Sequence, residues 1–334
     1  MFRKYLFAIV YSVLLTAFTV YVLMDTFVIT RVYSTVPAVE ASSEAGSDGA
    51  DSDTAVTDSD TAVADSYSAV AEAAVNASAS EQTGESPTSQ QPVSIATSYQ
   101  DENITITLTQ YREYDTSIYV ADITLSSPEY LQTALAQNAY GRHVTEKTSE
   151  MAVENGAILA INGDYYGAQE SGYVLRNGVP YRDIAERGQE DLVIYEDGSF
   201  EIITEDEVTA QELLDRGAVQ ILSFGPALVT DSEVSVTAGE EVGKAKSSNP
   251  RTAIGVIDDL HYVFVVSDGR TDESEGLSLY QLAEFMSELG AETAYNLDGG
   301  GSSSMVFNGN VINNPTTSGN RIKERSVSDI VYIG

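Results

Sequence analysis

The segment TAIGVIDDLHYVFVV, residues 252–266, contains two apolar runs separated by Asp258 and Asp259. Two such runs joined by a short polar turn predict a β-hairpin. The same kind of pattern predicts strand pairs in two other places, residues 104–111 with 117–125 and residues 192–203. The sequence therefore favours a fold built largely from antiparallel strands.

Four segments have the character of helices, and the strongest spans residues 277–290. Ser278 can cap its first turn, Gly290 can end it, and one face is apolar. The other expected helices cover residues 127–137, 146–156 and 209–217, and apolar strands are expected at 157–161 and 219–224. Together these elements predict an α+β fold: one globular domain of mixed, largely antiparallel β-sheet with a few packed helices, over residues 93–334.

The composition excludes several classes of function. The chain has 334 residues and no cysteine, which rules out disulfides, thiolate chemistry and cysteine metal sites. Its formal net charge is −34, from 51 acidic and 17 basic residues. Such a chain repels nucleic acid, so we expect no nucleic-acid partner. An anionic ligand would have to be bound by a few well-placed arginines.

The first 92 residues differ in character from the rest of the chain. Residues 1–4 carry two basic side chains and are expected to stay in the cytoplasm, while residues 5–29 are expected to form a transmembrane signal anchor. A cleaved signal peptide is the competing interpretation, but no clean cleavage motif follows the apolar run. Residues 30–92 are rich in Ala, Ser and Asp and predict a disordered acidic linker. The domain would then be extracellular and tethered to the cell membrane.

Polar residues gather directly after apolar, strand-like runs at four places, where side chains from a sheet converge at its rim. These clusters are residues 162–167 (NGDYYG), 249–252 (NPRT), 267–270 (SDGR) and 296–304 (NLDGGGSSS). Each cluster alone also reads as a turn, because Asn-Gly, Asp-Gly and Asn-Pro are ordinary turn dipeptides. Together they bring carboxylates, amides and arginines onto glycine-backed loops.

The loop of residues 299–304 has three glycines and three serines, which is more glycine than a simple turn requires. It is not a nucleotide-binding P-loop, because no lysine follows the glycines, and it lacks the oxygen ligands of an EF-hand. A serine nucleophile there would require a base, and the chain has only two histidines. The remaining interpretation is a loop whose backbone N–H groups face an anion beside Asp298.

Six segments, taken in order, closely resemble the phosphodiester glycosidase family. They are AINGDYYG (160–167), GYVLRNG (172–178), SFGPALV (223–229), NPRTAIGV (249–256), VVSDGR (265–270) and YNLDGGGSSSMVFNG (295–309). The resemblance covers about residues 95–334. It implies an enzyme that hydrolyses the bond between a sugar C1 and a phosphate, as in a GlcNAc-1-phosphodiester. The family includes many bacterial proteins that are exported or membrane-anchored, which suggests a phosphoglycan of the cell surface, such as an exopolysaccharide or a cell-wall polymer, as the substrate.

The chemistry of such a bond suggests roles for the polar clusters. A departing phosphate monoester is already a stable anion, so arginines can replace the acid of ordinary glycosidases. A carboxylate must then stabilise positive charge at C1 or activate water, and Asp298 is the first candidate, Asp164 the second. Asp268 is expected to orient an arginine. No cofactor is expected to be required, and no ligand spacing indicates a divalent metal, although one bridging Asp298 or Asp268 to the phosphate stays open.

The expected substrate-binding set is drawn from the same clusters and one later arginine. It comprises Asn162, Tyr165, Tyr166, Arg251, Thr252, Arg270, Asn296, Gly299, Gly300, Gly301, Ser302, Ser303 and Arg325. The asparagines would bind sugar hydroxyls, the tyrosines would form an apolar wall, and the loop amides would hold phosphate oxygens. Two alternatives stay open: a non-catalytic glycan-binding or cell-wall assembly module on the same scaffold, and a serine hydrolase that uses the triple serine.

Overall fold

The computed structural model describes residues 2–35, 92–239, 248–317 and 321–334, without the side chains of residues 2–9, 26–27 and 92–96. The predicted acidic linker, residues 30–92, therefore lies mostly outside the described residues. Its first part forms strand β1 (Arg31–Thr35). This strand pairs antiparallel with β6 (Ala139–Arg142), so the segment adds to the sheet structure of the domain.

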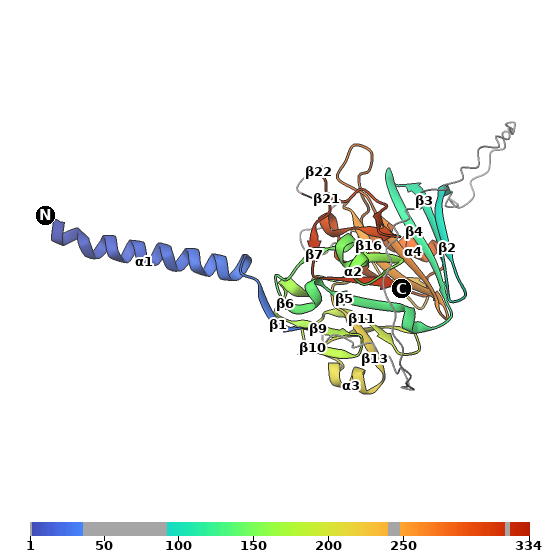
Figure 1. Ribbon diagram of the computed structural model, residues 1–334, viewed down its shortest axis with the longest axis horizontal. Helices are drawn as coiled ribbons and strands as arrows, with labels where there is room; N and C mark the ends of the chain where they lie inside the picture. The colour runs from blue at the N-terminus through green and yellow to red at the C-terminus, as the bar shows by residue number, and fades with distance from the viewer. Residues whose placement is uncertain (1, 36–91, 240–247, 318–320) are drawn as a thin grey trace, which may run out of the picture. The chain divides into compact units, whose positions relative to one another are not determined.

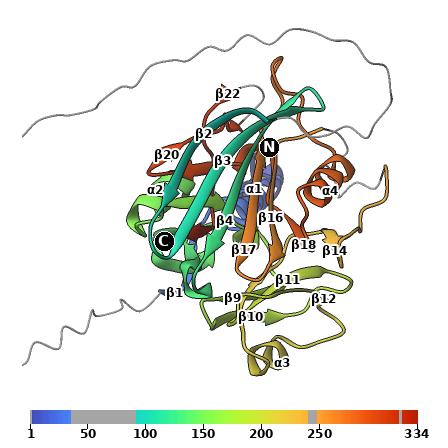
Figure 2. The same cartoon turned by 90° about the vertical axis from the view of Figure 1, so that its right-hand side faces the viewer.

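The largest sheet has eight strands in the order β15-β14-β18-β16-β17-β4-β3-β2; Figure 1 labels β2, β3, β4 and β16, and Figure 2 also labels β14, β17 and β18. Every pair in it is antiparallel. Its strands are β2 (Pro92–Gln100), β3 (Ile104–Glu113), β4 (Thr116–Leu125), β14 (Ala227–Thr230), β15 (Glu233–Val234), β16 (Arg251–Asp258), β17 (His261–Ser267) and β18 (Thr293–Leu297). The hairpin predicted at residues 252–266 is β16–β17, in the middle of this sheet.

Two five-stranded sheets complete the domain, in the orders β20-β19-β8-β24-β5 and β10-β9-β13-β11-β12. The first has β5 (Leu131–Leu135), β8 (Leu159–Asn162), β19 (Met305–Phe307), β20 (Asn310–Val311) and β24 (Asp329–Ile333). The second has β9 (Gly172–Arg176), β10 (Val179–Ile184), β11 (Glu190–Tyr195), β12 (Phe200–Thr204) and β13 (Ala218–Leu222). Two short pairs, β7 (Glu146–Lys147) with β23 (Ser326–Val327) and β21 (Thr316–Thr317) with β22 (Arg321–Ile322), lie beside them.

The apolar run of the β16–β17 hairpin is continuous because both faces of this sheet are buried. Ile254 and Phe264 face the main core, which also takes residues from β8, β19 and β24 and from β11 and β13. Val263 and Val265 point to the opposite face and pack against the helix α4 (Leu279–Glu288). Alternate residues of a strand point to opposite faces, so one hairpin contributes to two cores.

Helices cover the outer faces of the sheets. α4 flanks the eight-stranded sheet (Figure 2) and begins with a capping box formed by Ser278 and Gln281, which satisfies donors that the first helical turn leaves unpaired. α2 (Thr148–Glu154) packs on the sheet of β8 and β24, and α3 (Ala210–Asp215) packs on the sheet of β13.

Most of the predicted elements are confirmed, with one clear exception. The three hairpins and the helices at 146–156, 209–217 and 277–290 are all present. The helix predicted at 127–137 is wrong: one 3₁₀ turn (Pro128–Tyr130) leads into β5. β5 pairs with β24, which lies at the far end of the chain, so tertiary pairing overrides the local helix propensity. The described strand pairs are all antiparallel, where a mixed sheet was expected.

The predicted transmembrane segment, residues 5–29, coincides with helix α1 (Phe2–Phe27). Among the described residues, no helix reaches the combination of length and hydropathy that crossing a membrane requires, so the transmembrane prediction is not supported.

Phe285 tests the packing of α4 on the central sheet. Its side chain is fully buried, and the ring meets that of Tyr111 edge to face at 5.5 Å between centroids. We expect Phe285→Ala to lower the free energy of unfolding by about 3–5 kcal/mol, because it removes apolar contacts and leaves a cavity. Urea denaturation measures this loss. The exposed neighbour Glu288→Gln is the control, and its change should stay within about 0.5 kcal/mol.

Candidate active site

A cavity of about 470 Å³ opens where loops from several strands meet. Its walls come from the ends of β8, β13, β17 and β18, the start of β16, and the segment before β23. It is lined by Tyr165, Phe224, Asn249, Arg251, Arg270, Asn296, Asp298, Gly299, Gly300, Gly301 and Arg325. Nine of these are residues expected in the site from the sequence. Arg251, Arg270 and Asp298 share this one cavity.

Asp298 is held at the end of β18 by a ring of polar contacts. Its Oδ2 accepts hydrogen bonds from Ser302 Oγ at 2.5 Å and from Arg325 Nη2 at 2.8 Å. Arg325 Nε donates to Ser302 Oγ at 2.8 Å, so the three side chains form a closed triangle. The Asp298 side chain is 12% exposed and that of Arg325 is 41% exposed, so the triangle borders the solvent of the cavity.

Burial raises the pKa of Asp298 above the usual value of an aspartate. Arg325 and Ser302 act in the opposite direction and lower this pKa, because they stabilise the ionised carboxylate. The negative charge of Asp164 adds a further rise. The protonation of Asp298 therefore depends directly on the guanidinium beside it.

The glycine loop lies close to the side chain of Arg270. Gly300 has φ +63°, and a Cβ atom there would lie 2.8 Å from Arg270 Nη2. At Gly299 a Cβ atom would lie 2.9 Å from the carbonyl oxygen of Pro250. At Gly299 a side chain would collide with a backbone oxygen, and at Gly300 the positive φ favours glycine.

The backbone amides of Gly300, Gly301 and Ser302 were expected to hold an anion, but two of these three already donate hydrogen bonds within the protein. The Gly300 N–H donates to Pro250 O at 2.8 Å, and the Ser302 N–H donates to Gly299 O at 3.3 Å. The groups that the loop leaves available to an anion at the edge of the cavity are therefore mainly the nearby guanidinium groups, not its own amides.

Two arginines reach the cavity from the open end of the central hairpin, where the start of β16 pairs with the end of β17. Arg270 follows β17 with φ +63°, and its Nε and Nη2 donate to Asn249 Oδ1 at 3.1 and 2.9 Å. Arg251, at the start of β16, is almost fully buried and donates from Nε to Leu277 O at 2.9 Å. These contacts to neutral oxygens orient the two guanidinium groups at the cavity.

Besides the arginines, the cavity is lined by aromatic surface and by two amides, Asn249 and Asn296. Asn296 Nδ2 donates to Gly225 O at 2.7 Å, which fixes the amide, and its buried Oδ1 has no hydrogen-bond partner among the described residues. Tyr165 is 45% exposed and lines the cavity as expected. Phe224 lines it too and was missed from the sequence; its position at the end of the strand predicted at 219–224 was the available signal.

Several expected site residues lie beneath the cavity and do not line it. Asn162 is fully buried: its Nδ2 donates to Asp298 O at 2.6 Å, and its Oδ1 accepts from Thr252 Oγ1 at 2.8 Å and from the Ser304 N–H at 3.2 Å. With these contacts, Asn162 and Thr252 hold the strand ends together. Ser302 and Ser303 are also fully buried, and only Ser302 contacts Asp298.

Asp268 anchors a neighbouring loop, through contacts to Tyr119, Asn313 and Asn314. Its Oδ1 accepts from the Asn314 N–H at 2.7 Å, and its Oδ2 accepts from Tyr119 Oη at 3.2 Å. The expected role of orienting an arginine is therefore not what the geometry shows.

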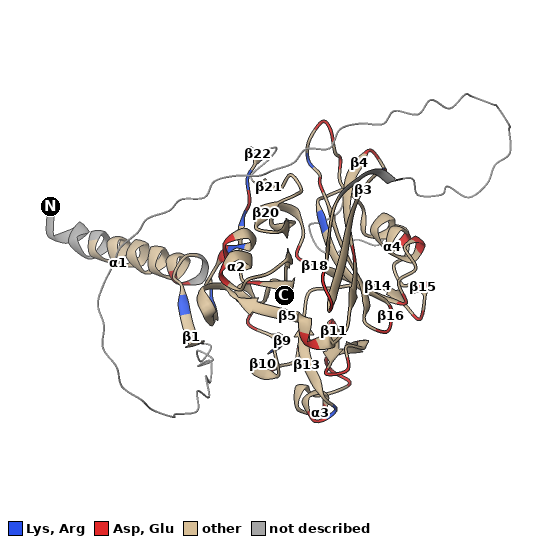
Figure 3. Cartoon of the chain, turned by 45° about the vertical axis from the view of Figure 1, so that its right-hand side comes forward, with Lys and Arg blue, Asp and Glu red and all other residues tan. Residues whose placement is uncertain are grey.

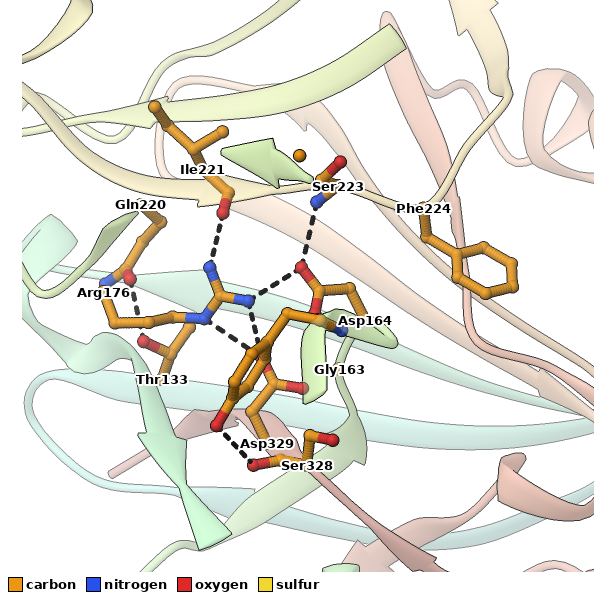
Figure 4. Close-up of polar contacts among 12 residues, drawn as sticks. Thr133, Gly163, Asp164, Arg176, Gln220, Ile221, Ser223, Phe224, Ser328 and Asp329 are labelled. Carbon is orange, nitrogen blue, oxygen red and sulfur yellow. Dashed lines mark hydrogen bonds and ion pairs between the residues drawn. The ribbon is translucent and has the colours of Figure 1, made fainter. Parts of the chain in front are cut away.

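Asp164 belongs to a buried ion cluster, shown in Figure 4. Arg176 Nη2 donates to Asp164 Oδ2 and to Asp329 Oδ2, both at 2.7 Å, and all three side chains are at most 2% exposed. The Ser223 N–H adds a hydrogen bond of 2.9 Å to Asp164 Oδ2. Tyr166 is fully buried beside this cluster, with Arg176 over its ring at 5.6 Å, so it packs in the interior and does not form a wall of the cavity.

This cluster supports the segment that carries Asp298. The Gly163 N–H donates to Asp329 O at 2.9 Å, and Gly163 O accepts from the Asp298 N–H at 3.3 Å. Burial and the charge of Asp164 raise the pKa of Asp329 to about 8, although Arg176 acts in the opposite direction. A cluster of one guanidinium and two carboxyl groups that keeps one proton is electrically neutral, which suits its burial.

Neither histidine lines the cavity: His261 Nε2 lies 3.2 Å from Asp122 Oδ1, and the His143 N–H donates to Gly167 O at 3.0 Å. No three His, Cys, Asp or Glu side chains of the described chain converge in a way that could hold a metal ion. The arrangement therefore offers one carboxylate, three guanidinium groups, two amides and aromatic surface.

Comparison with known proteins identifies the family. The phosphodiester glycosidase family profile matches residues 155–334, more than half of the chain. The chain belongs to the phosphodiester glycosidase family. The matched region contains Asp298 and the three arginines of the cavity, and the family predicted from the six motifs is confirmed.

Two curated relatives illustrate the range of this phosphodiester glycosidase family. The SPbeta prophage-derived uncharacterized protein YomE of Bacillus subtilis is 31% identical over 180 residues, which cover 52% of this chain and 28% of YomE. The N-acetylglucosamine-1-phosphodiester alpha-N-acetylglucosaminidase of Bos taurus is 30% identical over 184 residues, covering 50% of this chain and 34% of the bovine protein. This chain thus matches only about a third of these relatives' own length or less.

Among solved structures, the catalytic domain of the zebrafish enzyme of the same name, auto-inhibited by its pro-peptide, has a similar fold. The TM-score is 0.56 at 20% identity, over 73% of this chain and 87% of that chain. A hypothetical protein from Synechocystis gives a TM-score of 0.50 at 15% identity, over 70% of this chain and 62% of that chain. These likenesses support the fold of a phosphodiester glycosidase domain.

Arg176 is predicted to be essential to the ion cluster. Arg176→Met leaves two buried carboxyl groups without their counter-charge and should lower the free energy of unfolding by about 3–5 kcal/mol. Without the guanidinium, both carboxyl groups keep protons in the folded state at pH values where the unfolded chain has released them. The loss of stability should therefore grow as the pH rises from 5 to 8.

Urea unfolding of the variant at several pH values measures this effect. Arg216→Met is the matched control, because Arg216 pairs with Glu201 at the surface, and its removal should cost about 1 kcal/mol or less at every pH. Adding Asp329→Asn to Arg176→Met should restore part of the stability. A deficit in Arg176→Met that does not change with pH would contradict this account.

Proposed function

We propose that this protein hydrolyses sugar-1-phosphodiesters, breaking the bond between the anomeric carbon and the phosphate oxygen. The observation that carries the proposal is the composition of the cavity: one carboxylate, Asp298, shares it with three guanidinium groups, from Arg251, Arg270 and Arg325. Family membership supports the same reaction class. A relative named for N-acetylglucosamine-1-phosphodiester cleavage supports a sugar 1-phosphodiester as the substrate class.

A single carboxylate suits a leaving group that needs no proton. An ordinary glycosidase uses a second carboxylic acid to protonate the departing alkoxide. A phosphate monoester leaves as an anion that needs no such acid, and guanidinium groups stabilise it through charge-assisted hydrogen bonds. We therefore assign Arg270 and Arg325, the more exposed arginines of the cavity, to the phosphate, and Arg251 to the orientation of the neighbouring loop.

Asp298 then acts on the sugar side of the bond. As a carboxylate it stabilises the positive charge that develops at C1 while the C1–O bond breaks and the phosphate takes the electron pair. A water molecule adds to C1, and its surplus proton leaves through the carboxylate to solvent. Tyr165 and Phe224 would contact the sugar face, and the unpartnered Oδ1 of Asn296 would accept a hydrogen bond from a sugar hydroxyl or acetamido N–H.

The proposal predicts turnover that depends on Asp298. The full chain is incubated with methyl phosphodiesters of GlcNAc, glucose and galactose 1-phosphate, and release of free sugar is measured. Asp298→Asn should lower kcat/KM at least about 100-fold while the protein stays folded, because the amide carries no negative charge.

The same experiment separates the alternatives. No free sugar from any of the substrates, with binding retained by both the unchanged protein and Asp298→Asn, would favour a non-catalytic glycan-binding module. Activity that survives Asp298→Asn but is lost on replacing Ser302, Ser303 and Ser304 by alanine would favour a serine hydrolase.

The pH dependence of the reaction is a second prediction. Because Asp298 acts in its ionised form, kcat/KM should rise as the pH increases through its elevated pKa. Arg325 lowers that pKa, so Arg325→Gln should move the acid limb to higher pH, besides weakening substrate binding. The pH profile from 4 to 9 measures the shift, with the exposed Arg187→Gln as control. A limb that moves to lower pH in Arg325→Gln would contradict the assignment.

We also propose that the domain acts outside the cytoplasm. The support is the sequence of the N-terminus, where Arg3 and Lys4 precede an apolar segment, as in exported proteins. In intact bacterial cells that express the protein, added protease should digest the domain and leave a cytoplasmic marker uncut. Protection of the domain until the cells are lysed would contradict this location.

A further inference from the structure

A second cavity, of about 380 Å³, lies between β1, β6 and β10. Its size falls within the range of small-ligand sites, about 300–1,000 Å³. It is lined by three arginines, Arg31, Arg142 and Arg182, and by tyrosines that include Tyr33, Tyr140 and Tyr181. Nothing in the reaction proposed above uses these residues.

The placement of arginines in this chain is uneven. The sequence has 12 arginines against 51 acidic residues, and Figure 3 shows the basic residues as short isolated segments on the domain. Three arginines line the first cavity and three line the second, so half of them line two cavities. In a protein with net charge −34, such concentrations of positive charge point to anionic ligands.

Arg182 is the fixed charge of the second cavity. Its Nε donates to Gly172 O at 2.6 Å, and its Nη1 donates to Tyr166 O at 3.1 Å and to Gln169 O at 2.8 Å. These acceptors are neutral, and no carboxylate of the described residues forms an ion pair with Arg182. Its charge is thus held in place without being neutralised, and an anion in the cavity would neutralise it.

The other two arginines each form an ion pair with an acidic side chain. Arg142 Nη1 lies 2.5 Å from Oε1 of the exposed Glu170, and Arg31 pairs with Asp25. Exposed pairs of this kind contribute about 0–1 kcal/mol, so a phosphate with two charges can compete for these guanidinium groups. The acidic residues that line the cavity are Glu170 and Asp183, fewer than its arginines.

The aromatic residues give the site a surface for a sugar ring. Tyr140 is at the centre, with ring centroids 5.1 Å from Tyr181, 5.4 Å from Tyr166 and 5.8 Å from Tyr33. Gln169 adds a buried Oε1 that has no hydrogen-bond partner among the described residues. Buried acceptors are nearly always satisfied, so this oxygen suits a ligand hydroxyl group.

The two cavities share one short segment of chain. Tyr165 lines the first cavity, and Tyr166, Gly167 and Gln169, in and after the 3₁₀ turn Tyr166–Ala168, line the second. We propose that the second cavity binds a phosphorylated sugar and thereby holds another repeating unit of a polymeric substrate. The polymeric role rests on the proposed hydrolase function, whereas the binding of a phosphorylated sugar does not.

Calorimetric titration with glucose 6-phosphate tests the binding. The full chain carries Arg270→Gln and Arg325→Gln, so that binding of the phosphate in the first cavity does not contribute to the measured affinity. In this background, adding Arg31→Gln and Arg142→Gln should weaken the affinity at least tenfold. Adding Arg187→Gln and Arg216→Gln instead removes the same charge elsewhere on the domain and should leave the affinity unchanged.

Further arms test which part of the ligand is recognised. Glucose and inorganic phosphate should each bind at least tenfold more weakly than glucose 6-phosphate, because each lacks one half of the contacts. Tyr33 is 58% exposed, so Tyr33→Ser should weaken the binding of glucose 6-phosphate without disturbing folding. The proposal is overturned if the arginine variants titrate like their controls, or if the unsubstituted second cavity binds no glucose 6-phosphate.

Kinetics on the otherwise unchanged enzyme then test the polymeric role. Arg31→Gln with Arg142→Gln should raise KM for a phosphoglycan oligomer at least fivefold and leave kcat/KM for a methyl sugar-1-phosphodiester unchanged. Binding of glucose 6-phosphate without hydrolysis of any phosphodiester would contradict the proposed function but not the second site. Equal effects on both substrates would overturn the polymeric role.

Discussion

One buried amide joins the sheets at the point where the chemistry is expected. Asn162 ends β8 in one sheet, and its side chain contacts the end of β18 through Asp298 O and the start of β16 through Thr252. Apolar contacts hold the sheets together but do not fix how strand ends align, because the hydrophobic effect is not directional. Hydrogen bonds are directional, and an unsatisfied buried amide would cost about 1–3 kcal/mol, so this contact fixes where Asp298 lies.

The Arg176 cluster links the sheet that contains β9 to the sheet that contains β8 and β24. Arg176 ends β9, Asp329 begins β24, and Asp164 follows β8, so the ion cluster ties two sheets together directly below the cavity. Gly163 lies between the two ties, and a Cβ atom there would approach Asp329 Oδ1 to 2.4 Å. The Asn-Gly-Asp sequence resembles an ordinary turn, but each of its residues has a separate role. Asn162 and Asp164 make the two sets of contacts, and the glycine between them leaves room for Asp329.

Local patterns in the sequence predicted the hairpins and three helices because their signals lie within a few residues. The strand β5 was missed because its partner, β24, is at the other end of the chain, where no local pattern can indicate the pairing. For the site, Asp298 and Asp164 looked alike from the sequence, since both follow an apolar strand and an asparagine. What separates them is Arg176, which lies in a strand without any polar cluster and neutralises Asp164 in the interior. Phe224 was missed for a similar reason, because an aromatic residue after an apolar strand reads as part of the core.

A strongly acidic chain can still bind an anionic ligand, because the charges nearest to the ligand matter most. At physiological ionic strength, charges more than about 8 Å apart are largely screened, so the net charge of the chain acts weakly inside a cavity. There the nearest groups dominate, and in both cavities these are arginines that neutral oxygens hold in place: Arg270 by Asn249, and Arg182 by three backbone carbonyls. The acidic surface keeps the chain soluble and repels polyanions that do not fit, while a phosphate that reaches a cavity meets oriented positive charge. Selectivity for an anion then comes from the few positions where arginines outnumber carboxylates.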